Sequence, residues 1–152
     1  MSDITTVILA AGNSTRFKAS KSKLVYPLCG LPIVSHIFNI AKKISGKNIL
    51  IVSNEKNKEE LKLILNTSKL VIQKKQKGTA DAIEQVKKYV KSKNILILFG
   101  DTPLVEVKDI RKLVSKFKKS KAKASLIAFN TSEPHGYGRL LLLSLIHIWR
   151  CR

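Results

Sequence analysis

The sequence predicts an α/β protein built on an open, doubly wound, mostly parallel β-sheet. Short runs of β-branched and aliphatic residues alternate with amphipathic stretches of helical period along most of the chain. The runs are apolar almost throughout, which indicates strands that are buried on both faces, as in a parallel sheet. Strands that alternate with helices indicate βαβ units, which build sheets of this kind.

The elements follow from these patterns in chain order. The apolar runs predicted as strands are Thr5–Leu9, Asn48–Val52, Leu70–Gln73, Asn94–Phe99 and Ala124–Phe129. The stretches between them are predicted as helices because their apolar residues recur on one face. These helices run from Ile33 to Ile44, around Leu61–Leu65, from Ala82 to Val90 and from Val107 to Phe117. Pro32 suits the first turn of the first helix, and Thr79 is the expected N-cap of the third.

Composition bounds the function without deciding it. The 152 residues suit one domain, and an apolar fraction of 44% excludes an intrinsically disordered chain. The chain carries 29 Lys and Arg against 10 Asp and Glu, a formal net charge of +19. Such a charge usually points to nucleic acid or to an anionic membrane. Only 5 of the basic residues are Arg, the residue suited to bidentate phosphate contacts, and the 24 Lys are spread over every segment.

Targeting and cysteine patterns point to a cytoplasmic protein with no membrane segment. Cys29 and Cys151 form neither a metal-ligand spacing nor a disulfide framework. The chain begins without a basic region ahead of an apolar one, and its apolar runs are shorter than the roughly 17–25 residues that span a bilayer.

Candidate ligand-binding residues come directly after three predicted strands, where open α/β sheets bind ligands. After the first strand, Ala10, Ala11 and Gly12 allow close backbone approach to a ligand, and Arg16 could clamp phosphate oxygens. The segment matches neither the G-x-G-x-x-G fingerprint nor a Walker P-loop. The alternative is an ordinary turn with Arg16 facing solvent.

Two further segments have the same placement. Asp101 follows the fourth strand beside Gly100, which suits a Mg²⁺ ion held by one carboxylate and substrate phosphates. The alternative is a turn-forming residue ahead of a proline. Gln73 ends the third strand and can read a base edge, while Gly78 and Thr79 offer N–H groups at a helix start. The alternative there is a basic surface loop with a capping threonine.

Taken in order, these motifs resemble those of the sugar-nucleotide pyrophosphorylases. Within that group the match is to the N-acetylglucosamine-1-phosphate uridylyltransferase family, over about residues 4–140. The matching blocks are Leu9–Arg16, Lys23, Gly30-Leu31-Pro32-Ile33, Gln73 with Gly78-Thr79-Ala80, Gly100-Asp101-Thr102-Pro103-Leu104 and Gly136-Tyr137-Gly138-Arg139. The resemblance implies a Rossmann-like fold of the nucleotide-diphospho-sugar transferase type.

The resemblance also implies roles for individual residues. The nucleotide would be bound by Leu9, Ala10, Ala11, Gly12, Gln73, Gly78 and Thr79. Arg16 and Lys23 would act on the triphosphate as the catalytic residues, and Asp101 would hold Mg²⁺. Phe99, Gly100 and Gly138 would border the sugar.

The implied reaction transfers UMP from UTP to N-acetylglucosamine-1-phosphate, giving UDP-N-acetylglucosamine for cell-wall synthesis and pyrophosphate. The sugar phosphate is already an anionic nucleophile, so catalysis needs positioning and charge neutralisation rather than a protein base. The expected partners are these two substrates, with neither nucleic acid nor membrane, and a homo-oligomer of the full-length form is compatible with the resemblance.

Two departures from the family pattern affect the expectation. Ser14 stands where the family usually has Gly. The family's domain also continues beyond the G-Y-G-R block, through an Asn that completes its Mg²⁺ site. We therefore expect residues 1–142 to be a C-terminally incomplete domain, and the 152-residue chain to be inactive in turnover. Residues 143–152 resemble a translated transposon-end sequencing adapter, with an opal codon read as Trp149, and are expected to be non-native; the alternative is a genuine terminal strand.

Two alternative functions remain open. A nucleotidyltransferase for another sugar-1-phosphate or for molybdopterin would keep the first loop and Asp101 but change the acceptor pocket. A basic nucleic-acid-binding module would need aromatic residues interleaved with basic ones, whereas aromatic residues are only 6% of this chain.

Overall fold

The computed structural model describes residues 3–12, 17, 21–66, 69–75, 77–133, 135–136, 138 and 140. The chain divides into two compact units, Met1–Lys121 and Ala122–Arg152. The first unit holds every described helix and strand. In the part of the chain that the structure describes, no helix is both long and apolar enough to cross a membrane.

The first unit is built on a four-stranded parallel sheet, as the sequence predicts. Its strands are β1 (Ile4–Leu9), β4 (Ile49–Ser53), β5 (Leu70–Ile72) and β6 (Asn94–Phe99), in the spatial order β5-β4-β1-β6. The chain moves outward from β1 through β4 to β5, then returns to the other side of β1 as β6. The strand order therefore reverses between β1 and β6, the place where open α/β sheets bind ligands.

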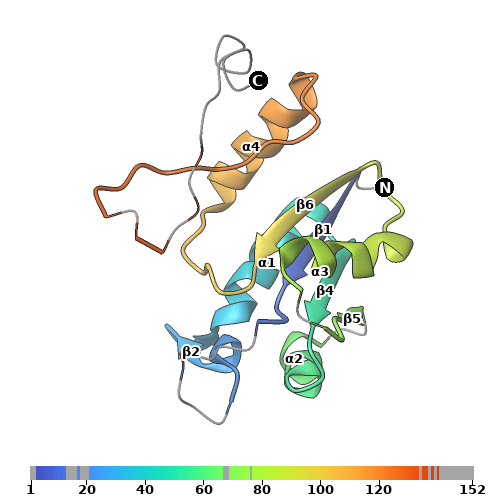
Figure 1. The fold of residues 1–152 in the computed structure, drawn as a ribbon, viewed down its shortest axis with the longest axis vertical. Coiled ribbons are helices and arrows are strands. Elements are labelled where there is room, and N and C mark those ends of the chain that lie inside the picture. Colours follow the sequence, from blue (N-terminus) through green and yellow to red (C-terminus); the bar gives the residue numbers. More distant parts are fainter. Residues whose placement is uncertain are drawn as a thin grey trace, which may run out of the picture. The chain divides into compact units, whose positions relative to one another are not determined.

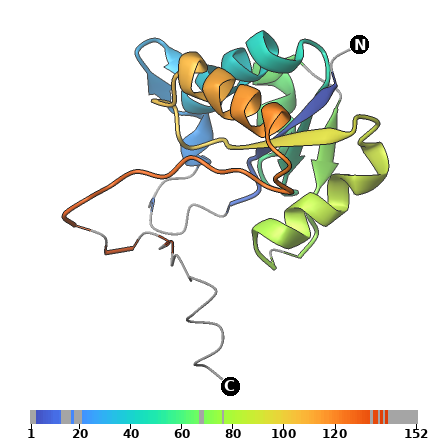
Figure 2. The same cartoon turned by 90° about the horizontal axis from the view of Figure 1, so that it is seen from above.

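Helices cover both faces of this sheet. The helices are α1 (Ile33–Ser45), α2 (Lys58–Leu65), α3 (Thr79–Val86) and α4 (Val107–Lys119). One core cluster joins α1, α2 and α4 to one sheet face through residues such as Ile8, Ile37 and Ile51. A second cluster joins α3 to the opposite face through Val7, Ala82 and Val86, and the two views show α3 on the far side of the sheet from α1 and α4 (Figures 1 and 2). These two layers confirm the doubly wound architecture.

A small hairpin that the sequence did not predict precedes α1. Its strands, β2 (Pro27–Leu28) and β3 (Leu31–Pro32), are antiparallel and joined by Cys29 and Gly30, both with positive φ. Ahead of it lies the short 3-10 helix η1 (Lys23–Val25). Pro32 therefore ends the hairpin and caps α1 rather than lying in the helix's first turn.

Two other expectations are wrong in detail. Thr79 is the first residue of α3, and the N-cap is Gly78, whose φ of 102° suits glycine. The Ala124–Phe129 segment, in the second unit, forms no strand, and its Leu126 and Phe129 side chains are exposed. Its apolar residues favour a strand, but apolar composition alone does not set strand pairing, and the described sheets do not include this segment.

Candidate functional site

A cavity of about 280 Å³ lies at the carboxyl ends of β1, β5 and β6, next to the point where the strand order reverses. Parallel strands end at the same sheet edge, so residues far apart in sequence meet there. Its lining residues are Leu9, Ala10, Ala11, Gly12, Lys23, Leu24, Gln73, Gly78, Thr79, Ala82, Phe99 and Asp101. All the predicted site residues described in the first unit line this cavity except Gly100.

Two asparagines hold the loop after β1. Asn57 Nδ2 donates to the carbonyl oxygen of Ala10 at 2.8 Å, and Asn54 Nδ2 donates to that of Ala11 at 2.9 Å. Each asparagine side chain also accepts the backbone N–H of the other, at 3.1 and 2.9 Å. Asn54 is 7% exposed and Asn57 3%. These bonds hold the backbone of Ala10 and Ala11 in place.

The same loop keeps one donor for a ligand. The N–H of Ala10 is bonded to the carbonyl oxygen of Val52 at 2.8 Å, continuing the sheet ladder beyond β1. Among the residues that the structure describes, no hydrogen bond engages the N–H of Gly12, which is exposed. Backbone N–H groups at turns of this kind can form anion-binding concavities, and the exposed N–H of Gly12 is a donor of that kind at the cavity.

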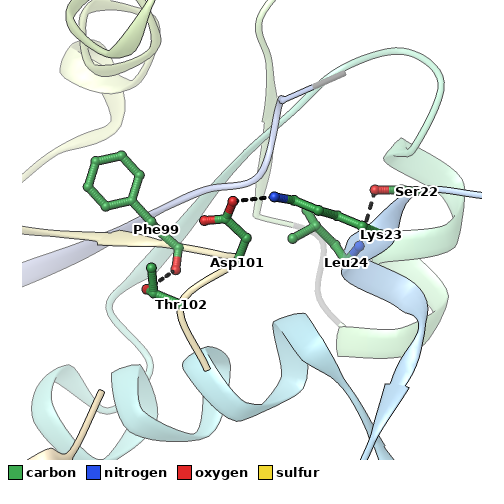
Figure 3. Close-up of polar contacts among 6 residues, drawn as sticks. All are labelled: Ser22, Lys23, Leu24, Phe99, Asp101 and Thr102. Atoms are coloured by element: carbon green, nitrogen blue, oxygen red, sulfur yellow. Dashed lines mark hydrogen bonds and ion pairs between the residues drawn. The ribbon is translucent and has the colours of Figure 1, made fainter. Parts of the chain in front are cut away.

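Lys23 and Asp101 face each other across the cavity mouth. Lys23 Nζ lies 2.5 Å from Asp101 Oδ2, and the side chains are 39% and 40% exposed (Figure 3). Lys23 is placed by the first turn of η1, where Ser22 Oγ accepts the N–H of Leu24. Asp101 is placed by a turn after β6, where Thr102 Oγ1 donates to the carbonyl oxygen of Phe99 at 2.9 Å. Neither side chain is locked in by burial, so both can exchange partners.

Gly100 lets β1 and the turn after β6 lie close together. Its N–H donates to the carbonyl oxygen of Leu9 at 2.9 Å. A Cβ on Gly100 would lie 3.1 Å from that same oxygen. Gly100 therefore joins the lining residues Phe99 and Asp101 without lining the cavity itself.

Gln73 lines the cavity and follows the last residue of β5. Its backbone N–H donates to the carbonyl oxygen of Ser53 at 2.8 Å, which continues the sheet, and the residue is 5% exposed. Its Nε2 donates to the carbonyl oxygen of Gly78 at 3.2 Å and to Asp81 Oδ2 at 2.6 Å. The Gln73 side chain thus ties the sheet edge to the start of α3.

Two predicted site residues lie outside the described part of the first unit. Arg16 lies outside the described residues. Gly138 belongs to the second unit, where it is exposed. Their assigned roles remain predictions.

The structure adds Leu24 and Ala82 to the lining and reveals three supporting residues that sequence reasoning missed. Asn54, Asn57 and Asp81 line no part of the cavity but bond to residues that do. A signal was available for the first two: two asparagines three residues apart, directly after a buried strand, are typical of reciprocal side-chain-to-backbone capping.

The cavity's donor set fits a divalent ion that is bound mainly through a ligand's phosphates. Within the described ranges, no group of three or more His, Cys, Asp or Glu side chains is arranged to hold a metal ion. Asp101 is the only carboxylate among the described lining residues. One carboxylate combined with substrate phosphates is the arrangement typical of Mg²⁺.

Two proteins of the same name are similar in sequence to this chain over most of its length. The protein named bifunctional protein GlmU from Buchnera aphidicola subsp. Schizaphis graminum is 42% identical over 140 residues, covering 91% of this chain and 30% of the relative. The protein of the same name from Campylobacter fetus is 40% identical over 147 residues, covering 93% of this chain and 33% of the relative. The chain thus spans about a third of the length of these relatives.

Solved structures share the fold at low sequence identity. A putative glucose-1-phosphate thymidylyltransferase from Bacillus anthracis superposes with a TM-score of 0.69 at 21% identity, covering 78% of this chain and 51% of the other. CMP:2-keto-3-deoxy-manno-octonic acid synthetase, solved in complex with CTP, superposes with a TM-score of 0.63 at 18% identity, covering 78% of this chain and 48% of the other.

The family is shown by a match over nearly the whole chain. A family model for the MobA-like NTP transferase domain matches residues 6–148. Together with the parallel sheet and the cavity at its switch point, this match shows that the chain belongs to the family of MobA-like NTP transferase domains.

Proposed function

We propose that this chain carries the nucleotide-binding part of a uridylyltransferase that transfers UMP from UTP to N-acetylglucosamine-1-phosphate. The observation that carries the proposal is the cavity, which gathers at one sheet edge the residues that the ordered motifs predict for the nucleotide. The GlmU relatives, 40% and 42% identical, support the same class of enzyme.

The cavity's residues divide by the part of UTP that each would bind. Gln73 lies beside α3 with its amide held, and would contact uracil. Gly12 and Lys23 also line the cavity and would contact the triphosphate through an N–H group and an ammonium group. Arg16 would join them there. Residues from different segments of the chain would thus bind the base and the phosphates.

Catalysis by positioning suits these groups. An oxygen of the sugar phosphate attacks the α-phosphorus of UTP, a new P–O bond forms, and the bond to the leaving pyrophosphate breaks. No Ser, Cys or His is among the described residues that line the cavity, and the proposed reaction needs none, because the sugar phosphate is itself the nucleophile. Lys23 would instead orient the triphosphate for in-line attack and offset its negative charge.

A divalent metal ion, Mg²⁺ in our proposal, is part of this function. Asp101 would hold it, with the remaining ligands supplied by phosphate oxygens and water. A mycobacterial neighbour with a TM-score of 0.62 was solved in complex with manganese. When bound, such an ion neutralises charge on the phosphates.

Binding to the 152-residue chain tests the nucleotide part of the proposal. We expect isothermal titration calorimetry with Mg²⁺ present to give tighter binding of UTP than of CTP or GTP. Lys23→Met should weaken UTP binding by about 10-fold, because a hydrogen bond to a charged group contributes about 1.5–3 kcal/mol. Lys21→Met is the matched control, because Lys21 is exposed and lines no part of the cavity. Equal loss in both variants would contradict the role of Lys23.

Turnover by the complete reading frame tests the acceptor. We expect pyrophosphate release from UTP only when N-acetylglucosamine-1-phosphate is supplied. No release, or equal release with CTP, would contradict the proposal. Stronger release with another sugar-1-phosphate or with molybdopterin would favour the alternative acceptors. We place this activity in the cytoplasm, where it would supply UDP-N-acetylglucosamine for the cell wall, and a homo-oligomer of the longer protein is compatible with it.

We also propose that residues 1–142 belong to a longer transferase domain and that residues 143–152 are non-native. The coverage of the relatives supports a longer protein, because this chain spans only about a third of their length. The match to the family model ends at residue 148, within the segment in question. A longer read of the same locus tests this: native sequence that continues through Trp149 would contradict it.

A further inference from the structure

We propose that Asp81 is a positioning residue that makes Gln73 an acceptor-only reader of the base and thereby favours uracil over cytosine. The proposal rests on the proposed function, which places the base beside Gln73. Asp81 itself lines no part of the cavity, so it would act only through Gln73.

The amide of Gln73 has one permitted orientation. Both groups within hydrogen-bond distance of its Nε2, the carbonyl oxygen of Gly78 at 3.2 Å and Asp81 Oδ2 at 2.6 Å, are acceptors without a proton to give. Turning the amide over would set Oε1 against two oxygens. The structure therefore identifies the nitrogen end of this amide by its partners.

Both N–H bonds of the Gln73 amide are directed at these two acceptors. The only other polar atom that the side chain can offer to a ligand is Oε1, which accepts but does not donate. In the described part of the chain no hydrogen bond engages this oxygen, while Gln73 lines the cavity. The side chain is thus presented to a ligand as a single acceptor.

A single acceptor at this place distinguishes the two pyrimidines. Uracil carries a proton on N3 and can donate it to Oε1. Cytosine has a lone pair on N3, which would oppose the lone pairs of an Oε1 placed opposite N3. Its N4 amino group could reach Oε1 only if the base shifted from the position that uracil takes, and otherwise the partly buried acceptor would be left without a donor. Unpaired groups of this kind are costly, so the acceptor rejects cytosine as well as binding uracil.

Asp81 contributes more to this orientation than Gly78. A hydrogen bond to an ionised carboxylate is about twice as strong as a neutral one, and 2.6 Å is a short distance for it. Asp81 lies in the first turn of α3, whose Ala82 and Val86 are buried in the core on that face of the sheet, so its position is set by packing. Without Asp81, only the longer bond to Gly78 would oppose rotation of the amide.

A purely structural role for Asp81 makes a different prediction. An acidic residue in the first turn of a helix stabilises that helix through its dipole. Losing that effect would lower thermal stability and weaken the binding of every nucleotide alike. Loss of the amide orientation would change the ratio of UTP to CTP affinity instead.

The experiment is titration calorimetry of UTP and CTP, each with Mg²⁺, on the 152-residue chain and its variants. We expect Asp81→Ala to reduce the UTP-to-CTP affinity ratio by about 3- to 10-fold. This fold-change corresponds to the free energy of one hydrogen bond between the base and a Gln73 amide that can now turn over. Asp81→Asn offers Gln73 both an acceptor oxygen and an N–H₂ donor without a charge, so it no longer excludes the reversed amide, and its ratio should fall between those of the wild type and of Asp81→Ala. Glu84→Ala, the matched control, removes an exposed carboxylate from the same helix and should leave the ratio unchanged.

A double-mutant cycle separates the inference from a folding effect. In a Gln73→Ala background, Asp81→Ala should leave the affinity ratio unchanged, because no amide remains to be oriented. A ratio that stays at the wild-type value in Asp81→Ala, or that falls equally in Glu84→Ala, overturns the role of Asp81 alone. A wild-type chain with no preference for UTP overturns the proposed uracil site, and this inference with it.

Discussion

Two sets of polar contacts support the same cavity by opposite means. The asparagine pair beneath the β1 loop is neutral, 3–7% exposed, and bonded to backbone carbonyls at 2.8 and 2.9 Å. The Lys23–Asp101 pair at the cavity mouth is charged and about 40% exposed. The buried set fixes the backbone, whereas the exposed set holds charges that a bound triphosphate and its metal ion can take over.

The difference follows from the cost of desolvation. Taking a charged pair out of water costs several kcal/mol per ion, whereas a neutral amide that satisfies its bonds is tolerated in the interior. A loop that must keep one shape is therefore well held by Asn54 and Asn57. A pair whose charges must exchange partners is better left half in water. This contrast predicts how variants of the two sets of contacts should behave.

Removing Asn57 should have the largest effect. Asn57→Ala leaves the carbonyl oxygen of Ala10 and the N–H of Asn54 without their partners in a buried site. At about 1–3 kcal/mol for each of these two unsatisfied groups, we expect the unfolding free energy to fall by about 2–6 kcal/mol. Urea denaturation monitored by circular dichroism measures this loss, and UTP binding should weaken along with it.

Ser53→Ala provides the control for the Asn57 variant. Ser53 is fully buried next to Asn54, and its Oγ has no hydrogen-bond partner among the described residues. Removing an unsatisfied buried hydroxyl should leave stability unchanged or raise it by up to about 1 kcal/mol. A loss in Ser53→Ala as large as in Asn57→Ala would show that any truncation here is damaging and would contradict a specific role for the asparagine.

Adding a methyl group at Gly100 should have an intermediate effect on the same loop. In Gly100→Ala the new Cβ would lie 3.1 Å from the carbonyl oxygen of Leu9, on backbone that the sheet holds in place. Overpacking of this kind costs about 1–3 kcal/mol. Urea denaturation should show a loss in that range, smaller than that of Asn57→Ala.

Gly12→Ala is the matched substitution, since a Cβ built on Gly12 meets no atom of the described residues within 4 Å and its φ is not positive. We expect a stability change of at most about 0.5 kcal/mol, as for surface substitutions in general. If Gly12→Ala destabilises as much as Gly100→Ala, close approach of Gly100 to Leu9 is not the cause.

The sequence predicted the frame of the fold because burial leaves a pattern in it. The four strands of the sheet are continuous apolar runs, and their bounds agree with the predictions to within one residue. The β2–β3 hairpin was missed because strands of two residues carry no period. Ala124–Phe129 has the composition of a strand, but composition does not provide a pairing partner.

The candidate site was predicted where the motif residues themselves line the cavity. Gln73, Gly78 and Asp101 were found because ligands bind beyond the ends of parallel strands. Their supports were not found, since Asn54 and Asn57 act on carbonyl groups more than 40 positions earlier in the chain. Only the folded sheet brings β1 beside β4, so no local pattern could have revealed those partners.

Neutralising Asp101 should affect stability least while changing binding in a direction that depends on metal. Exposed ion pairs contribute about 0.2–1 kcal/mol, so Asp101→Asn should alter unfolding free energy by less than about 1 kcal/mol.

Without metal, the Asp101→Asn variant frees Lys23 and removes a negative charge from the proposed phosphate site, so UTP should bind about 2- to 5-fold more tightly. With Mg²⁺, the ion should tighten UTP binding to the variant less than it does to the wild-type chain, because the one carboxylate among the described lining residues is gone. Calorimetry with EDTA and with Mg²⁺ measures both signs, with Glu55→Gln, an exposed carboxylate outside the cavity lining, as the control. Weaker binding by Asp101→Asn in both conditions would mean that the Lys23–Asp101 pair is a fixed support like the asparagines, and that the contrast between the two sets of contacts does not hold.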